Sequence, residues 1–399
     1  MSKFASLLVL TVIANTGMGI IMPVLPVYFK RYGVGVVELG GPFVMLVAGR
    51  MVSRAFAPSL IGMVGHRKTV MACFAIYAAT FAAYLGAQSL YLFSGLRFLE
   101  GIVEGLLAVA LNDLAIAYTQ GLDSMRRTQL MGRFGASFGL GFVLGPMLGS
   151  SIAWLFGLRA IFVAGALLGV AAIGLAAWMV NDAPAQLAVF PAAQLRGLGG
   201  IGLLLGLYSP LCLRRVVFFS LMILLPLYVT EQLGMGIESA GLFFAVSAVL
   251  TTTLMPQASR WAERIGVRRA VWTGLLVMAV AIAAMGITRD PVVFWALFVV
   301  ESIAFALMLP PAMTIFSGAV DSQATRTRIL GNMAFATETI SLPLAAILPW
   351  SYARSPAYAW ALVALLCLLA LALFLVSGRA LARRHGPGGA ADEQPLKAS

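Results

Sequence analysis

The sequence predicts an all-α polytopic membrane protein with twelve transmembrane helices in two six-helix pseudo-repeats. Of its 399 residues, 61% are hydrophobic and 11% are charged, whereas soluble domains carry about 25% charged residues. Apolar runs long enough to cross a bilayer recur along the whole chain. Short segments of the first half also recur in the second half, which indicates a duplicated unit.

Twelve apolar segments define the expected helices. In the first half these segments are 4–28, 40–62, 69–88, 90–118, 134–155 and 160–180. In the second half they are 215–232, 239–259, 270–287, 291–318, 329–350 and 357–377. We expect 181–214 to be a cytoplasmic linker between the halves 1–180 and 215–378. The polar, Gly-rich tail 379–399 is expected to be disordered.

The distribution of basic residues predicts the orientation in the membrane. Most of the 27 Lys and Arg residues lie in loops that share one side if the N-terminus is cytoplasmic, which the positive-inside rule favours. We therefore expect a multi-pass protein of the plasma membrane (the bacterial inner membrane) with both termini in the cytoplasm. Because the basic residues lie in these loops, the net charge of +12 does not indicate nucleic-acid binding.

Three pairs of segments carry the internal repeat. Leu25–Tyr28 (LPVY) resembles Leu225–Tyr228 (LPLY), and the remaining two pairs have nearly the same separation. They are Gly65–Lys68 with Gly266–Arg269, and Arg127–Gly132 with Arg326–Gly331. Two parallel six-helix repeats place a substrate cavity near the bilayer midplane between them.

A charged face interrupts the apolar segment 90–118. Arg97, Glu100 and Glu104 are spaced by three and four residues, so all three lie on one face of a helix. A charge at bilayer depth costs about 2.5–3.5 kcal/mol on insertion scales, which indicates a functional group or an internal partner. The alternative is a buried ion pair that only fixes helix packing.

A glycine motif in the fifth expected helix links the chain to a known family. Gly141-Phe-Val-Leu-Gly145-Pro146-Met-Leu-Gly149-Ser150 resembles the antiporter motif G-x-x-x-G-P-x-x-G-G of the major facilitator superfamily in all but the last position. The resemblance covers almost the whole chain and implies the major facilitator fold. Glycines four residues apart provide a smooth face for close helix contact, and Pro146 removes a backbone donor.

The segment Arg97-Phe-Leu-Glu100-Gly101 resembles the helix 4 motif R-x-x-q-G of the same superfamily. In proton-coupled members the arginine is linked to proton transfer, and here an acid occupies the glutamine position. The resemblance therefore implies proton coupling through Arg97 and Glu100. Glu104 matches no motif position, and it is either a separate proton site or a partner of Arg97.

The loop after the second helix resembles the family's gate motif G-x-L-a-D-r-x-G-r-k incompletely. Gly62 occupies the position of the usual acid, which puts the charge relay of the first half in doubt. We interpret His66 and Lys68 as topology determinants. The expected gate-loop residues are Gly65, Arg67, Glu263, Arg264, Gly266 and Arg268.

Further polar and aromatic residues fall within the apolar segments. Glu301 and Glu338 lie near the midplane and are candidate proton-coupling residues, with pairing to an Arg of the other half as the alternative. Arg54 is expected to snorkel towards the inner side, and Asp113 to face the headgroups. Candidate residues of the substrate cavity are Asn15, Tyr28, Arg50, Phe138, Phe142 and Tyr228.

These observations predict a secondary transporter rather than an enzyme. The sequence contains no phosphate-binding G-x-x-x-x-G-K-[ST] loop and no Cys/His set with metal spacing, so we expect no cofactor and no metal. The favoured function is proton-coupled antiport that exports a drug-like compound or a polar metabolite such as a siderophore. We expect the protein to work as a monomer. The mixed charges favour a polar or zwitterionic cargo. The alternatives are an importing symporter or facilitator, and a non-transporting sensor on the same fold.

Overall fold

The protein is helical throughout the residues that its computed structural model describes, which are 3–31, 33–87, 89–180, 201–318 and 323–385. These ranges contain thirteen α-helices, one short 3₁₀ helix (η1) and no strand. The helices are α1 (Lys3–Ile20), α2 (Leu25–Arg31), η1 (Val37–Leu39), α3 (Gly40–Val64), α4 (His66–Tyr84), α5 (Leu90–Tyr118), α6 (Ser124–Phe156), α7 (Ala160–Met179), α8 (Ile201–Glu231), α9 (Ile237–Ile265), α10 (Val267–Met285), α11 (Pro291–Gly318), α12 (Gln323–Arg354) and α13 (Pro356–His385).

The described helices agree with the predicted polytopic architecture. Within the described residues, ten segments are long and apolar enough to cross a membrane, and α1 with α2 counts as one of them. The two remaining long helices within the described ranges, α4 and α12, do not meet this measure. The ten segments together with α4 and α12 correspond to the twelve expected spans.

The seventh span begins earlier than its hydropathy suggested. The apolar part of α8 is Gly206–Glu231, so Arg214 and Arg215 lie inside a helix that was expected to begin at residue 215. Arg214 is accommodated because its guanidinium group lies 4.5 Å from the ring centre of Phe305 on α11, a favourable cation–aromatic contact. The boundaries of the two halves themselves stay a prediction.

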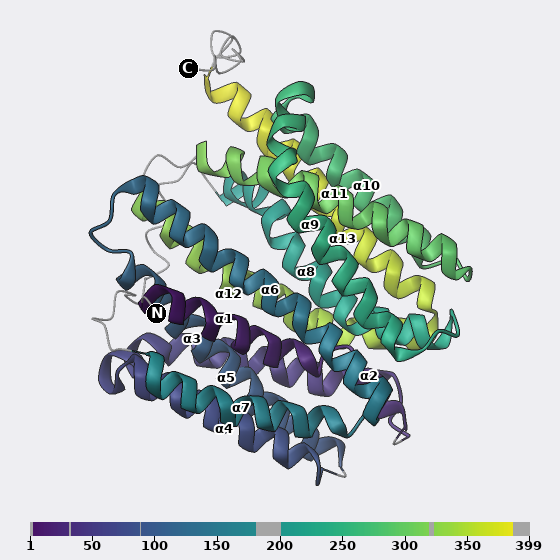
Figure 1. The fold of residues 1–399 in the computed structure, drawn as a ribbon. Helices are drawn as coiled ribbons and strands as arrows, with labels where there is room; N and C mark the ends of the chain where they lie inside the picture. Colours follow the sequence, from purple (N-terminus) through teal and green to yellow (C-terminus); the bar gives the residue numbers. More distant parts are fainter. Residues whose placement is uncertain (1–2, 32, 88, 181–200, 319–322, 386–399) are drawn as a thin grey trace. The chain divides into compact units, whose positions relative to one another are not determined.

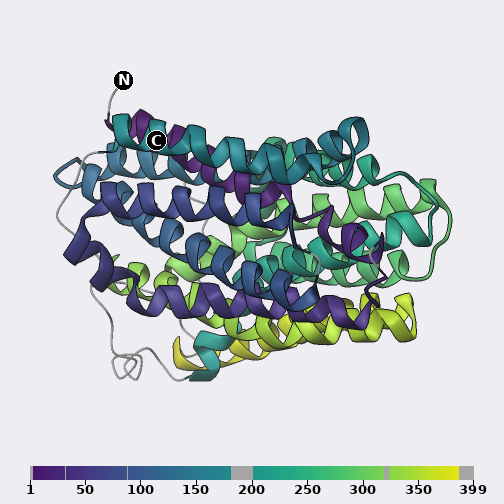
Figure 2. The same ribbon diagram turned by 90° about the horizontal axis from the view of Figure 1, so that it is seen from below.

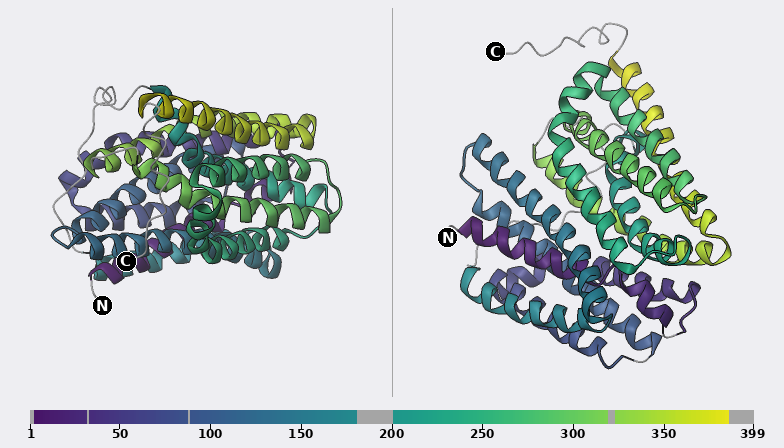
Figure 3. Two further views of the ribbon diagram at one scale, coloured as in Figure 1. Left: turned by 90° about the horizontal axis from the view of Figure 1, so that it is seen from above. Right: turned by 45° about the vertical axis from the view of Figure 1, so that its right-hand side comes forward.

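The chain forms two compact units, which we describe separately. The first contains α1 to α7 together with Leu221–Ala248 of α8 and α9 and Glu338–Arg354 of α12. In this unit α1 packs against α6, α3 against α5, and α4 against α7 (Figure 1). The second unit contains α10, α11, α13 and the remaining parts of α8, α9 and α12. In it, α10 packs against α11 and α13 (Figures 2 and 3).

Close contact between α1 and α6 depends on the glycines of the antiporter-like motif. A Cβ atom on Gly145 would lie 2.7 Å from the Cα atom of Gly19, and one on Gly141 would lie 2.6 Å from the Cβ atom of Asn15. A Cβ atom on Gly149 would overlap the carbonyl oxygen of Ile20. Any larger side chain at these positions would therefore push the two helices apart.

Equivalent loops of the two repeats share one backbone conformation. Gly65, between α3 and α4, has φ of 88°, and Gly266, between α9 and α10, has φ of 91°. Residues with a side chain rarely adopt such positive values. The repeated glycine therefore serves the same sharp turn in both halves.

Candidate functional site

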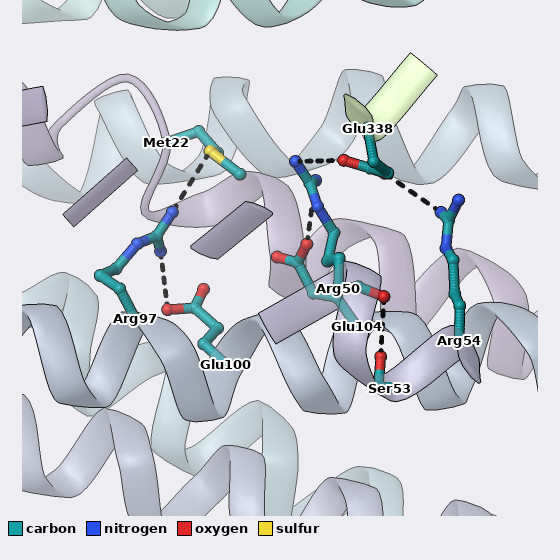
Figure 4. A network of polar contacts seen from close by, with 8 residues as sticks. All are labelled: Met22, Arg50, Ser53, Arg54, Arg97, Glu100, Glu104 and Glu338. Carbon is teal, nitrogen blue, oxygen red and sulfur yellow. Dashed lines mark hydrogen bonds and ion pairs between the residues drawn. The ribbon is translucent and has the colours of Figure 1, made fainter. Parts of the chain in front are cut away.

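Arg97 and Glu100 form a fully enclosed ion pair on α5. The Arg97 Nη1 atom lies 2.6 Å from the Glu100 Oε2 atom, and neither side chain is exposed. The same carboxylate oxygen accepts a 2.8 Å hydrogen bond from the Tyr84 hydroxyl. The other terminal nitrogen of Arg97 lies 3.8 Å from the Met22 sulfur (Figure 4).

Aromatic rings surround the Tyr84 side of this pair. The Tyr84 ring stacks on Phe93 at a centroid distance of 5.4 Å and lies 5.3 Å from Phe162. Tyr28 contacts the same two rings edge-on, at 5.6 and 5.0 Å. Tyr28, which we proposed as a cavity residue, is thus buried within an aromatic cluster.

A second and more open cluster joins α3, α5 and α12 (Figure 4). Arg50 contacts two carboxylates, with its Nη1 atom 3.3 Å from Glu104 Oε2 and its Nη2 atom 3.3 Å from Glu338 Oε2. Glu338 also contacts Arg54, whose Nη2 atom lies 3.2 Å from Oε1. The Arg50 side chain is 17% exposed and that of Arg54 is 15% exposed. We call these four residues the charge cluster.

Packing between α3 and α5 holds Arg50 beside Glu104. A Cβ atom on Gly105 would lie 3.0 Å from the carbonyl oxygen of Arg50, and one on Gly101 would lie 3.1 Å from the Arg50 backbone nitrogen. Gly49 likewise approaches the α5 backbone. These glycines bring the two helix backbones close enough for the side chains to meet.

The charged face of α5 is thus divided between two environments. Charge-assisted hydrogen bonds of this type usually measure about 2.7–2.9 Å. The Arg97–Glu100 contact, at 2.6 Å, is slightly shorter than this range, whereas the contacts of the charge cluster are 3.2–3.3 Å long. The enclosed pair fits the structural alternative stated above, while the charge cluster has longer contacts and partly exposed arginines.

Glu301, in the second unit, differs from the other buried acids. It is 4% exposed, and the neighbouring Ser302 hydroxyl donates a 3.4 Å hydrogen bond to its carboxylate. Among the described residues no ion pair within 4.0 Å involves Glu301. Arg214 is the nearby cation that acts on it electrostatically.

The structure also places the remaining cavity candidates. Asn15 is buried, and its amide donates a 2.7 Å hydrogen bond to the Thr11 carbonyl oxygen. Phe138 contacts the Phe134 ring edge-on at 5.1 Å. Phe142 is partly exposed on α6, and Tyr228 is buried on α8.

At the gate loops, the expectation that Asp113 faces the headgroups was wrong, because Asp113 is paired with His66. The His66 Nε2 atom lies 2.9 Å from the Asp113 Oδ2 atom, and both side chains are almost fully buried. Asp113 therefore faces the protein and not the headgroups. The sequence did contain a signal that His66 has a specific role, because His66 occupies a basic position of the gate motif. Arg67 donates to the Ala177 carbonyl oxygen, while Glu263, Arg264 and Arg268 are exposed.

Sequence reasoning also missed a polar contact at the predicted outer end. Lys30 on α2 pairs with Glu231 on α8, and the Tyr352 hydroxyl on α12 lies 3.4 Å from the Glu231 carboxylate. Nearby, a Cβ atom on Gly241 would lie 2.7 Å from the Cβ atom of Ser150. Glu231 balances the positive charge of Lys30.

The described residues contain no group of three or more His, Cys, Asp or Glu side chains placed to hold a metal ion. The three cysteines are free and buried.

A bundle of long apolar helices with buried, paired charges defines the class of protein: a polytopic membrane protein. The chain belongs to the Major Facilitator Superfamily, which matches residues 7–211 and again residues 207–398. It is a transporter of that family and not an enzyme, and its expected substrate is a small molecule. A search among curated proteins found no match.

Solved structures show the same fold at low sequence identity. A mutant of the nucleoside transporter NupG is 14% identical with a TM-score of 0.72, covering 96% of this chain and 100% of that one. A bacterial homologue of the human lysosomal transporter Spinster is 14% identical, with a TM-score of 0.74 and coverage of 94% and 96%. A D-xylose–proton symporter is 16% identical, with a TM-score of 0.73 and coverage of 94% and 98%.

Proposed function

We propose that the protein is a proton-coupled antiporter that exports a small polar organic molecule by alternating access. The observation that carries this proposal is the charge cluster, in which Arg50 is shared between Glu104 and Glu338. Glu104 lies midway along α5 and Glu338 midway along α12. Ionisable groups at that depth typically mark proton and substrate pathways.

Coupling follows from the way the carboxylates share their cations. Protonation of Glu104 or Glu338 removes one negative charge and weakens its contact with Arg50 or Arg54. The released arginine and the neutral acid then offer a different set of contacts to the cargo. Proton and cargo therefore compete for the same carboxylates, which is the condition for exchange. In this proposal the charge cluster performs the proton coupling that the helix 4 resemblance implied for Arg97 and Glu100. Glu301 stays a second candidate for a proton-coupling residue.

The membrane setting of the proposal keeps the predicted orientation, with both termini in the cytoplasm of a bacterial inner membrane and a monomer as the working unit. The main alternative is a symporter, and a structural neighbour is described as a proton symporter. A sensor without transport is the other alternative. The direction of proton movement separates these three functions.

Everted membrane vesicles with an acidified interior test the proposal. A small-molecule extract of the host cells is added outside, and a pH-sensitive dye reports the proton gradient. An antiporter takes up cargo and releases lumenal protons, so the gradient should collapse with the wild type and persist with Glu104→Gln. The exposed Glu38 provides the matched control, and Glu38→Gln should behave as the wild type. A symporter or a sensor leaves the gradient intact.

A further inference from the structure

Glu338 occupies a place that fits the carboxylate of a ligand. Its two carboxylate oxygens contact different arginines, Oε2 with Arg50 and Oε1 with Arg54. The two arginines are four residues apart on α3, so they project from one face of that helix. A carboxylate bridged by two guanidinium groups is a strong and geometrically specific recognition unit. Here the carboxylate between the two arginines belongs to Glu338, on another helix.

The contacts of Glu338 suit exchange for a ligand. They measure 3.2 and 3.3 Å, which is longer than usual for a charge-assisted hydrogen bond. Both arginines are partly exposed, whereas Arg97 in the enclosed pair is not. A ligand carboxylate can therefore replace Glu338 on Arg50 and Arg54 without opening the aromatic cluster.

The charges of the cluster are balanced. Two arginines, Arg50 and Arg54, face two glutamates, Glu104 and Glu338. Two further charged groups, Arg97 and Glu100, act on Glu104 from its own helix, and their opposite charges compensate each other. A cargo that carries one positive and one negative group adds no net charge to the cluster at membrane depth, where an uncompensated charge is costly. Such a cargo also offers a group of each sign, one for the arginines and one for the glutamates.

The geometry points to a zwitterionic amino-carboxylate as the cargo of this site, with its carboxylate on Arg50 and Arg54 and its ammonium group on the displaced Glu338 and on Glu104. This inference rests on the proposed export function. It also explains competition with protons, because protonation of either glutamate removes an acceptor for the ammonium group. The two arginines of the cluster recognise the cargo, and its two glutamates exchange the cargo for the proton.

The test compares small molecules in the medium of cells that express the wild type, Arg54→Gln or no protein. Each compound whose export depends on the protein is assigned a charge class from its electrophoretic mobility across pH. We expect these compounds to be zwitterions. We also expect Arg54→Gln to export them at least tenfold less than the wild type does. Arg289 is exposed and lies outside the cluster, so Arg289→Gln should export normally. Surface levels of each variant are measured to separate loss of function from loss of folding.

Three outcomes decide the matter. Protein-dependent compounds that are purely cationic, purely anionic or uncharged would overturn the zwitterion inference and leave the export proposal standing. No protein-dependent compound at all would overturn the export proposal, and the inference with it. If zwitterions are exported, their methyl-ester and N-acetyl derivatives should compete at least tenfold less well than the parent. Equal competition by the ester would show that Arg50 and Arg54 do not bind the carboxylate.

Discussion

Glu100 and Glu104 lie one turn apart on α5, yet their neighbours give them different roles. Glu100 accepts from both Arg97 and Tyr84 in a fully enclosed setting. Glu104 reaches across to Arg50 on another helix and shares that arginine with Glu338. The Arg97–Glu100 pair is fully enclosed, whereas Glu104 shares Arg50 with a second carboxylate and both arginines of that cluster are partly exposed.

This division predicts unequal losses of stability for two conservative substitutions. Glu100→Gln leaves Arg97 as a buried charge without a carboxylate, and breaking such a pair typically costs about 3–5 kcal/mol. We expect a clear fall in the melting temperature of the purified protein, measured by intrinsic fluorescence in detergent. Glu104→Gln should lower it much less, since Arg50 keeps its contact with Glu338. Equal destabilisation by both variants would argue against the division.

The two environments could not be separated from the sequence alone. Spacing showed that Arg97, Glu100 and Glu104 share a helix face, but it did not show that Tyr84 and Met22 enclose one end of that face. The expected alternative for Glu338, pairing with an Arg of the other half, is what the structure shows with Arg50 and Arg54. The sequence could not identify these two arginines, because contacts between distant helices are not encoded in local periodicity. Arg54 was expected to snorkel towards the inner side, yet it contacts Glu338.

At the scale of helices, glycines determine which elements can approach closely. The stripe on α6 that faces α1 was recognisable from its spacing in the sequence. The second glycine contact, between α3 and α5, was not recognised, because Gly49, Gly101 and Gly105 are distributed over two helices. This contact is the one that aligns Arg50 with Glu104.

The α3–α5 contact can be tested with a matched pair of substitutions on α5. A Cβ atom on Gly101 would overlap the Leu46 carbonyl oxygen, whereas Gly95 has no neighbouring atom within 4 Å of its Cβ position. We expect Gly101→Ala to destabilise the protein by about 1–3 kcal/mol, as overpacking usually does. Gly95→Ala should leave the thermal unfolding curve unchanged. Similar curves for the two variants would contradict the close contact.

Hydropathy predicted most helices well, since long apolar runs are the strongest signal in a membrane protein. It failed at the start of α8, where Arg214 and Arg215 made a helical segment resemble a linker. The cation–aromatic contact of Arg214 with Phe305 depends on α11, so no local pattern around residue 214 could reveal it.

For the whole molecule, the contacts at the predicted outer end join helices of both sequence repeats within the first unit. Lys30 pairs with Glu231, and Ser150 packs against Gly241. Alternating access in parallel-repeat transporters requires such contacts to break and re-form. We infer that the Lys30–Glu231 pair helps to hold the outer end closed.

A cysteine in place of Ser150 reports on this closure. Ser150 is buried, so Ser150→Cys should react slowly with a membrane-impermeant maleimide added outside the cells. Lys30→Glu in that background should speed labelling severalfold, because Glu231 then faces a like charge. Adding Glu231→Lys should restore slow labelling by reversing the pair. If the double exchange labels as fast as Lys30→Glu, the pair does not contribute to closure.

The central claim is that proton and cargo compete for the charge cluster, and proton release on binding tests it most directly. The compound identified by the export comparison is added to detergent-solubilised protein in weakly buffered solution, with a pH dye as the readout. The wild type should release protons, and Glu104→Gln with Glu338→Gln should release none while Glu38→Gln matches the wild type. Proton uptake by the wild type, or undiminished release by the double variant, would contradict the account.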